Sequence, residues 1–395
     1  MTNDTLKLTD RKVLERARTD LQEHLPLQAN GYKCTTEQLL DVLLGVAANH
    51  STLEAICADL VGTPDADTIR QYLNKQLKVE GLVPGTDGLR HLEGCLNDAL
   101  AAEIASRVWR HARDIAIDLH DRSYYGRGSQ EEGLWVRGKA KDGTTRFHRV
   151  ATAYVMLDGL RVTLAIRFFL PEDNVMSVLR TLLDRIRGLG VHVNRLFLDK
   201  GFASVEVMTY LNGSGLSALI ACPIRGRAGG TRALCQGNKS YRTPHTFKGQ
   251  KGHSVTADLA VCRIFTTAKR TGRLQRRAEW LTFILIHLDL SPRQARRLYR
   301  RRFGIETSYR CAGRMRGWTT SPNPAYRFLL IGLSFFLVNA WLYLRWQFTQ
   351  VPRRGGRYLD TKSFQLTRFA NFIDRALEQR YGCVHEIIAP AVPLP

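Results

Sequence analysis

The stretch Leu298–Arg310 combines one carboxylate with a dense block of arginines. Ser291–Pro292 precedes it as a hydroxyl cap and a first-turn proline, which is how helices commonly begin. At about 100° per residue, four side chains fall on one face of the predicted helix, within roughly 60°: Tyr299, Arg302, Glu306 and Arg310. A lone acid among cations suits a site where a metal ion meets phosphate, and it also suits a surface ion pair.

Two aspartates each follow a short apolar run that is typical of a strand. Ile115–Ile117 ends in Asp118, and Leu196–Leu198 ends in Asp199. If these strands are neighbours, both carboxylates lie at one end of the sheet, where a packed helix could bring Glu306. Phosphodiester chemistry by two metal ions needs such hard oxygen ligands around Mg²⁺ or Mn²⁺. Aspartates after strands are also common turn residues, so the three acids indicate a site only together with the basic helix.

Positive charge is in excess and is concentrated in one segment. The chain has 58 Lys+Arg against 36 Asp+Glu, a net charge of +22 with a pI near 10.0. This excess predicts a polyanionic partner, nucleic acid before a membrane surface. Arg263 to Arg316 contains 15 Lys/Arg and 3 Asp/Glu, so +12 of the +22 lies there. The segment supplies further candidate DNA contacts: Arg296, Arg297, Arg300, Arg301 and Arg314.

Composition excludes several other classes of protein. The eight cysteines are scattered without a Cys-x-x-Cys pair, which argues against a zinc site. With no signal peptide, we expect a cytosolic protein with reduced thiols. The run Phe328–Leu344 is apolar but short for a membrane span of about 20 residues, and arginines flank it. A buried core helix is the better interpretation.

The first part of the chain, residues 1–110, is predicted to be a helical DNA-binding domain. Thr35–Glu37 caps an apolar run, and two short amphipathic segments, Ser51–Leu60 and Ala66–Leu77, flank a turn at Gly62–Pro64. This pair resembles a helix-turn-helix, with Arg70 on the candidate recognition helix. Helical bundles contain similar pairs for packing reasons, so DNA contact here stays open.

The remaining chain predicts an α/β fold with an RNase H-like core. Residues 111–223 contain strand-like runs joined by a turn at Asp158–Gly159, then a helix at Asn174–Arg187 and the strand before Asp199. Residues 224–290 predict a β-rich insertion, and 291–348 complete the mixed sheet and its flanking helices. Residues 349–395 predict a C-terminal helical segment with a basic turn at Arg353–Arg357 and a flexible, proline-rich tail. Its apolar face is either a subunit interface or a seal over the core: Phe364, Phe369, Phe372 and Ile373.

These motifs resemble those of the DDE transposases of bacterial and archaeal insertion sequences. The resemblance is to the IS-four-like branch, which has a β insertion before the catalytic glutamate. In that branch a tyrosine is followed after two intervening residues by an arginine, after three more by the glutamate, and after six more by a lysine. The chain supplies Tyr299, Arg302 and Glu306, but has Gly313 in place of the lysine. The similarity covers roughly residues 110–345, and includes Ile115–Asp118 and Leu196–Phe202.

The resemblance implies a role for each of these residues. Asp118 would bridge two Mg²⁺ or Mn²⁺ ions, while Asp199 and Glu306 would each hold one. Tyr299 and Arg302 would hold phosphates near the cleaved end. In relatives a tryptophan of the insertion stacks on a flipped base; Trp280 is the candidate here, although a buried strand tryptophan is the simpler interpretation. His120 and Asp121 either support Asp118 or are polar turn residues, and the sequence does not decide between these.

The implied activity is metal-dependent cleavage and strand transfer of double-stranded DNA. The protein would bind the terminal inverted repeats of its own element and a target DNA. It would act as a homodimer on paired ends, without a membrane, in the cytoplasm at the nucleoid. Two alternatives keep the same residues: a domesticated, catalytically reduced DNA-binding protein, and an RNase H-like nuclease without strand transfer.

Overall fold

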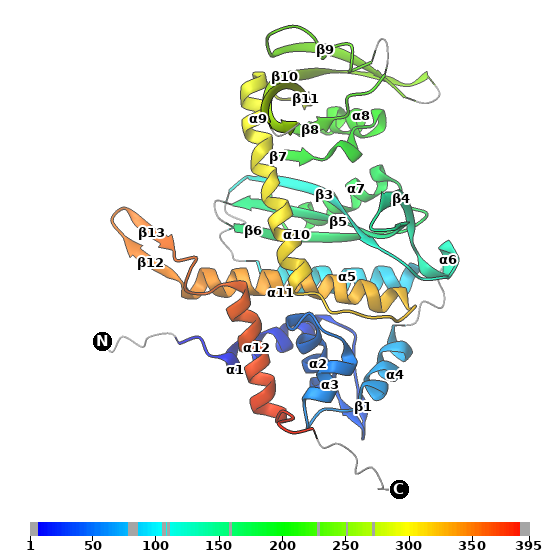
Figure 1. The fold of residues 1–395 in the computed structure, drawn as a ribbon, viewed down its shortest axis with the longest axis vertical. Coiled ribbons are helices and arrows are strands. Elements are labelled where there is room, and N and C mark those ends of the chain that lie inside the picture. The colour runs from blue at the N-terminus through cyan, green and yellow to red at the C-terminus, as the bar shows by residue number, and fades with distance from the viewer. Residues whose placement is uncertain are drawn as a thin grey trace. The chain divides into compact units, whose positions relative to one another are not determined.

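The structure, a computed structural model, describes residues 7–77, 86–104, 108, 111–157, 160–226, 230–249, 252–270 and 273–387. The chain divides into two compact units (Figure 1). The helical unit comprises Met1–Ile104, Gly126–Leu134 and Ser308–Pro395. The sheet unit comprises Ala105–Tyr125 and Trp135–Thr307.

Helices dominate the helical unit. They are α1 (Asp10–His24), α2 (Thr36–Ala48), α3 (Leu53–Asp59), α4 (Ala66–Gln76), α5 (Thr86–Ala102), α6 (Gln130–Gly133), α11 (Pro324–Phe348) and α12 (Leu366–Tyr381). Two strand pairs accompany them: β1 (Asn30–Gly31) with β2 (Cys34–Thr35), and β12 (Gln350–Arg353) with β13 (Gly356–Leu359). The cap predicted before the first apolar run is confirmed, because Thr35 and Gln38 form a capping box at the start of α2.

Helix α11 forms the core of the helical unit. It is long and apolar enough to cross a membrane, but most of it is buried against α2, α5 and α12, as predicted for a core helix. Asn323 caps its first turn, followed by Pro324. The buried amide of Asn339 donates to the carbonyl of Leu100, which satisfies a polar group in the middle of the helix.

Helix α12 seals this core. It packs against α1, α2 and α11. Phe369 and Ile373 are fully buried, and the ring of Phe364 is also buried, 6.2 Å from that of Phe369. Phe372 is only half-buried. Of the two roles that the sequence left open for this apolar face, the structure therefore shows the seal over the core.

The two short helices expected around Gly62–Pro64 are α3 and α4. Thr52 and Asp65 cap them by accepting hydrogen bonds from backbone N–H groups of the first turn. Arg70 lies on α4, where its guanidinium forms ion pairs with Glu54 and Asp67. Its charge is thus neutralised within the pair of helices.

A nine-stranded mixed sheet dominates the sheet unit. Its strands are β3 (Arg113–Ser123), β4 (Val136–Lys141), β5 (Thr144–Leu157), β6 (Leu160–Phe169), β7 (Val193–Leu198), β8 (Ala218–Cys222), β9 (Tyr241–Lys248), β10 (Ser254–Arg270) and β11 (Arg273–Ile286). The helical elements are α7 (Val175–Gly188), η2 (Lys200–Phe202), α8 (Val205–Ser214), α9 (Pro292–Arg300) and η4 (Arg301–Phe303). Helix α10 (Gly304–Arg314) begins in this unit and ends in the helical unit.

The order of the strands is β4-β5-β3-β7-β8-β11-β10-β9, with β6 also paired to β5. β3, β5 and β6 are antiparallel, whereas β7 and β8 continue from β3 in parallel. The central runs Ile115–Ile117 and Leu196–Leu198 are fully buried, as expected for strands covered on both faces. Helix α7 follows β6, capped by Asn174. This is the order of antiparallel strands, helix and parallel strands that was predicted.

The insertion continues the same sheet. β11 pairs with β8, and β10 then pairs with both β11 and β9. The apolar runs Val255–Ile264 and Trp280–Ile286 lie within β10 and β11. The predicted turn at Asp158–Gly159 and the proline-rich tail from Ala389 lie outside the described residues.

Two local predictions were wrong. Strand β3 does not end at Asp118 but continues to Ser123, because β5 pairs with it over that length; only full burial of the strand ends there. The helix predicted to carry Tyr299, Arg302, Glu306 and Arg310 on one face is not continuous, because the tighter turn η4 interrupts it. Gly304, a weak helix former, follows this turn directly and begins α10.

Candidate active site

The register of β3 and β7 brings two aspartates together. These strands run parallel, and their last pair joins Ile117 to Leu198. The next residue of each chain segment is an aspartate: Asp118 within β3, and Asp199 at the start of η2. The Asp118 side chain is 15% exposed and that of Asp199 34%. Both carboxylates therefore lie where the parallel pairing of β3 with β7 ends, beside the carboxyl end of β7.

One guanidinium contacts both carboxylates. Nη2 of Arg302 lies 2.6 Å from Oδ1 of Asp118, and Nη1 lies 3.7 Å from Oδ1 of Asp199. Arg302 is 7% exposed. A charge buried this deeply is tolerated only when it is paired, so the two aspartates and the arginine support one another. The tight turn η4 places Arg302 inward while its neighbour Arg301 is exposed.

Tyr299 attaches the basic helix to the sheet. Its hydroxyl donates to the carbonyl of Leu198, the residue before Asp199, at 3.1 Å. The ring is buried 4.9 Å from that of Phe283 on β11, and the Arg302 guanidinium lies 5.5 Å from its centroid. Burial raises the pKa of the phenol well above its ordinary value. Tyr299 is therefore a neutral donor that fixes the end of α9 beside the acidic pair.

Glu306 completes the predicted set from α10. Its side chain is exposed, one helical turn beyond Arg302. The pKa of Asp118 is raised from 3.8 to about 6. Burial is the largest cause; Arg302 opposes it, and the negative charges of Asp199 and Glu306 add to it. The three acids thus interact electrostatically, although only two of them contact Arg302.

The outward face of α9 carries free positive charge. Arg297 and Arg300 are exposed, and neither forms an ion pair within the described residues. Arg293, which the sequence analysis did not single out, is exposed on the same face, four residues before Arg297. Arg296 is half-buried, and Arg301 lies 3.5 Å from the carboxylate of Asp114. The three exposed arginines are those that can meet phosphates.

Other predicted DNA contacts lie elsewhere. Trp280 is half-buried on β11, paired across the sheet with Arg263. Arg310 and Arg314 are exposed on the part of α10 that belongs to the helical unit. Arg70 of α4 is half-buried and paired with two acidic residues. For these residues the structure gives position and exposure, and their contact with DNA stays a prediction.

The neighbours of Asp118 are strand residues. His120 and Asp121 lie within β3, and Asp121 receives two hydrogen bonds from the Arg149 guanidinium of β5, at 2.5 and 2.9 Å. This bidentate pair holds two central strands together. His120 and Asp121 are therefore not turn residues, because both lie within a strand. The side chain of Asp121 binds Arg149 and so stabilises the pairing of β3 with β5.

A second arginine that sequence reasoning missed lies beside the helix of Glu306. A Cβ atom placed on Gly304 would be 2.3 Å from Nε of Arg161, so the glycine allows this guanidinium to approach the start of α10. A glycine inside a helical pattern two residues before Glu306 was the available signal.

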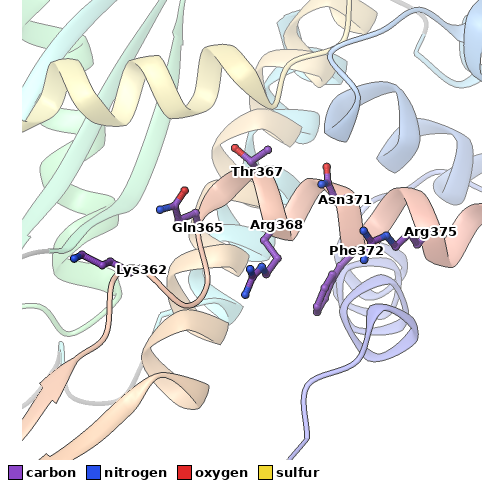
Figure 2. Close-up of a pocket in the computed structure, with 7 residues that line it drawn as sticks. All are labelled: Lys362, Gln365, Thr367, Arg368, Asn371, Phe372 and Arg375. Atoms are coloured by element: carbon purple, nitrogen blue, oxygen red, sulfur yellow. The ribbon is translucent and has the colours of Figure 1, made fainter.

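A hollow of about 600 Å³ is found in the helical unit (Figure 2). It is lined by side chains at the start of α12: Lys362, Gln365, Thr367, Arg368, Asn371, Phe372 and Arg375. None of the three acids lies in it. It is basic and polar, and its residues belong to the helical unit, whereas the acidic pair belongs to the sheet unit.

The donor chemistry of the acidic pair fits a divalent cation. Asp118 and Asp199 offer hard oxygen atoms, and the pKa of Asp118 is raised mainly by burial, with a smaller contribution from the neighbouring acids; a bound cation would stabilise the buried negative charge. Among the residues described, no group of three Asp, Glu, His or Cys side chains is gathered closely enough to hold one ion. The Arg302 guanidinium contacts the pair instead.

The mixed sheet carries acidic side chains beside the carboxyl end of β7, with a basic helix attached there, as in an RNase H-like fold. Residues 112–328 match the family model described as "Transposase DDE domain". The match covers more than half of the chain, and the chain belongs to this family of DNA transposases. Its members generally use divalent metal ions.

The fold is similar to that of a solved transposase. The cryo-EM structure of the piggyBac transposase synaptic complex with hairpin DNA aligns with a TM-score of 0.56 at 10% sequence identity. The alignment covers 98% of this chain and 81% of that chain. At this identity the likeness shows the fold, and the predicted α/β, RNase H-like class is confirmed. A comparison with curated proteins found no match.

The raised pKa of Asp118 predicts a pH-dependent cost in stability. The folded pKa, about 6, lies above the value of 3.8 in the unfolded chain, so the folded state binds the proton more tightly. Stability is then lost as pH rises from about 4 to about 6. Between pH 4 and pH 7, we expect the free energy of unfolding of Asp118→Asn to rise by about 2 kcal/mol relative to that of the wild type. Urea denaturation in EDTA across this range measures the difference, with Asp184→Asn, at an exposed ion pair, as control. A difference that does not vary with pH would contradict the assignment.

Proposed function

We propose that this DNA transposase binds the terminal inverted repeats of its own insertion sequence, cuts the DNA there and joins the freed ends to a target. The observation that carries the proposal is the acidic pair of Asp118 and Asp199 at the end of neighbouring strands, contacted by Arg302 from the basic helix. Polynucleotide chemistry needs both charges in one place: acids for a metal ion, and cations for phosphate.

In this proposal Asp118, Asp199 and Glu306 hold two Mg²⁺ or Mn²⁺ ions. When bound, such ions activate water or a 3′-hydroxyl for in-line attack and stabilise the leaving oxygen. The chain itself orients the ligands. The N–H of Leu119 donates to Oδ1 of Asp118 at 2.9 Å, and Arg302 contacts the same oxygen, which fixes the carboxylate plane. Tyr299 holds α9 against the strand that precedes Asp199.

DNA is proposed to run along the exposed face of α9. Arg293, Arg297 and Arg300 provide three charges on one side of a helix whose other side, through Tyr299, is attached beside the acidic pair. Phosphates bound to these arginines would lie on the helix that Tyr299 attaches beside the acidic pair. Trp280 would stack on a flipped base if a hairpin forms; the piggyBac complex contains hairpin DNA.

The remaining assignments also belong to this proposal. Residues 1–110 would bind the element ends, 111–223 and 291–348 would form the catalytic core, 224–290 its insertion, and 349–395 the C-terminal segment. The protein would pair two ends as a homodimer and work in the cytoplasm, at the nucleoid.

Loss of any one carboxylate should abolish cleavage. We expect Asp118→Ala, Asp199→Ala and Glu306→Ala each to lower Mg²⁺-dependent nicking of DNA carrying the element ends by at least about 10³-fold. Binding to the same DNA in EDTA should change by less than about threefold, because phosphate contacts remain. Glu206→Ala, an exposed acid on α8, is the control. Near-native nicking by one variant would exclude its residue as a ligand.

The same assay separates the alternatives. Nicking without joining of precut ends to a target plasmid would identify a nuclease. Binding of the ends without nicking by the wild type would identify a domesticated DNA-binding protein.

Arg302 should compete with a metal ion for the two aspartates. Its removal leaves their negative charge uncompensated, so we expect Arg302→Gln to bind Mn²⁺ roughly tenfold more tightly at pH 8 without DNA. Electron paramagnetic resonance of free Mn²⁺ measures this. Arg301→Gln, the adjacent residue paired to Asp114, should show wild-type affinity. Equal affinity in all three proteins would mean that the ion does not bind at this pair.

The exposed face of α9 should contribute to salt-dependent binding. Each phosphate contact adds about 0.9 to the slope of log K against log salt. We expect the triple change Arg293→Gln, Arg297→Gln and Arg300→Gln to reduce the slope by about 2 to 3. Removing three exposed charges elsewhere, at Lys139, Lys141 and Arg187, is the matched control. An unchanged slope would place the DNA on another surface.

A further inference from the structure

The basic turn noted in the sequence is the tip of an isolated β-ribbon. Strands β12 (Gln350–Arg353) and β13 (Gly356–Leu359) pair antiparallel, and within the described residues no further strand joins them. In Figure 1 the ribbon extends beyond the end of α11, away from the other helices of its unit. Its connection has two residues, Arg354 and Gly355, and Gly355 takes a φ of +84°, a left-handed conformation that glycine adopts without steric cost. The ribbon is therefore specified locally.

The arginines of the ribbon point in three directions. Side chains alternate between the faces of a strand, and the register pairs Arg353 with Gly356 and Pro352 with Arg357. Arg353 and Arg357 therefore lie on opposite faces, and Arg354 lies at the tip. All three are exposed. Neither Arg353 nor Arg354 has an ion-pair partner within the described residues, and Arg357 donates only to the amide oxygen of Gln350, at 3.4 Å.

Among the described residues of the helical unit, no acidic side chain forms an ion pair with this cluster of arginines. A two-stranded ribbon is marginal in water, and three like charges within five residues weaken it further. Its large aromatic side chain, Tyr358, is 48% exposed, so apolar packing contributes little at the tip. A bound polyanion would relieve the repulsion of the arginines and order the ribbon.

The arrangement of the charges selects the kind of polyanion. A flat anionic surface would meet one face of the ribbon and leave the other arginine in water. A groove of duplex DNA has phosphates on both walls. The major groove, about 12 Å wide, admits a two-stranded ribbon, whereas the minor groove, about 6 Å wide, does not without deformation.

We propose that the β12–β13 ribbon enters the major groove of duplex DNA, with Arg353 and Arg357 on the phosphates of the two walls and Arg354 toward the base edges. Lys362, Arg368 and Arg375, which line the hollow at the start of α12, would bind phosphates of the DNA backbone outside the groove (Figure 2). Residues 350–375 contain six Lys/Arg and two Asp, so the whole segment is basic. The inference rests on the proposed function only for the identity of the polyanion as DNA.

The test compares two proteins that lose the same charge. One carries Arg353→Gln, Arg354→Gln and Arg357→Gln; the other carries Lys139→Gln, Lys141→Gln and Arg187→Gln, exposed residues of β4 and α7. Binding to a fluorescent 40-base-pair duplex of random sequence is measured by anisotropy in EDTA at several salt concentrations. We expect the ribbon variant to lose at least tenfold in affinity at 0.1 M salt and about 2 to 3 units of slope, and the control to change by less than half a unit. Thermal unfolding should be unchanged in both variants, because the tip is outside the core.

Dimethyl sulfate then identifies the groove, since it modifies guanine N7 in the major groove and adenine N3 in the minor groove. The wild type should protect guanine N7, and the ribbon variant should not. Wild-type slope in the ribbon variant would overturn the proposal, and protection at adenine N3 alone would overturn the major-groove assignment. Because binding is read in EDTA, failure of the proposed transposase activity would appear separately, as a lack of Mg²⁺-dependent nicking.

Discussion

The ion pairs of Arg302 with Asp118 and Asp199 are the interaction on which the sheet unit's candidate site depends. Asp118 comes from β3, Asp199 follows β7, and Arg302 comes from the turn between α9 and α10. Without the guanidinium, two carboxylates would face each other at the end of a buried sheet. Breaking a buried pair by removing one partner typically costs several kcal/mol, because it leaves a charge without compensation. The contact therefore also determines where the basic helix can lie.

The same arrangement explains why the site suits chemistry on DNA. The raised pKa of Asp118 means that its negative charge is held against burial and against two other acids. That unfavourable state costs stability, and it is what a divalent cation would relieve. Tyr299 hydrogen-bonds to the strand that leads to Asp199, so the helix that displays Arg297 and Arg300 is attached at the acidic pair. The segment from Arg297 to Arg302 thus displays arginines for phosphate and also contacts the two aspartates that would bind a metal ion.

Positive charge is divided between surfaces of different kinds. On α9 the free arginines lie along one face of a helix, which suits one side of a DNA backbone. On the β12–β13 ribbon they lie on opposite faces and at the tip, which suits a groove. Arg70, in contrast, is paired with two acidic neighbours, and Arg301 lies 3.5 Å from Asp114, which also pairs with Arg195. The total of 58 Lys+Arg therefore overstates the number of cations that are free to bind, because some of them are engaged in ion pairs.

The sequence by itself determined the type of the main helices and central strands, because caps and apolar runs act locally. Thr35, Asn174 and Ser291 begin helices where expected, and the runs before Asp118 and Asp199 are buried strands. It also singled out the acids that the sheet then brings together. It did not show that Arg302 is buried while Arg301 binds Asp114, or that the insertion extends the core sheet through β8 and β11. Those outcomes depend on contacts between residues far apart in the chain. A pattern of neighbouring residues carries no information about which distant partner satisfies a charge or a strand edge, so only the tertiary structure decided them.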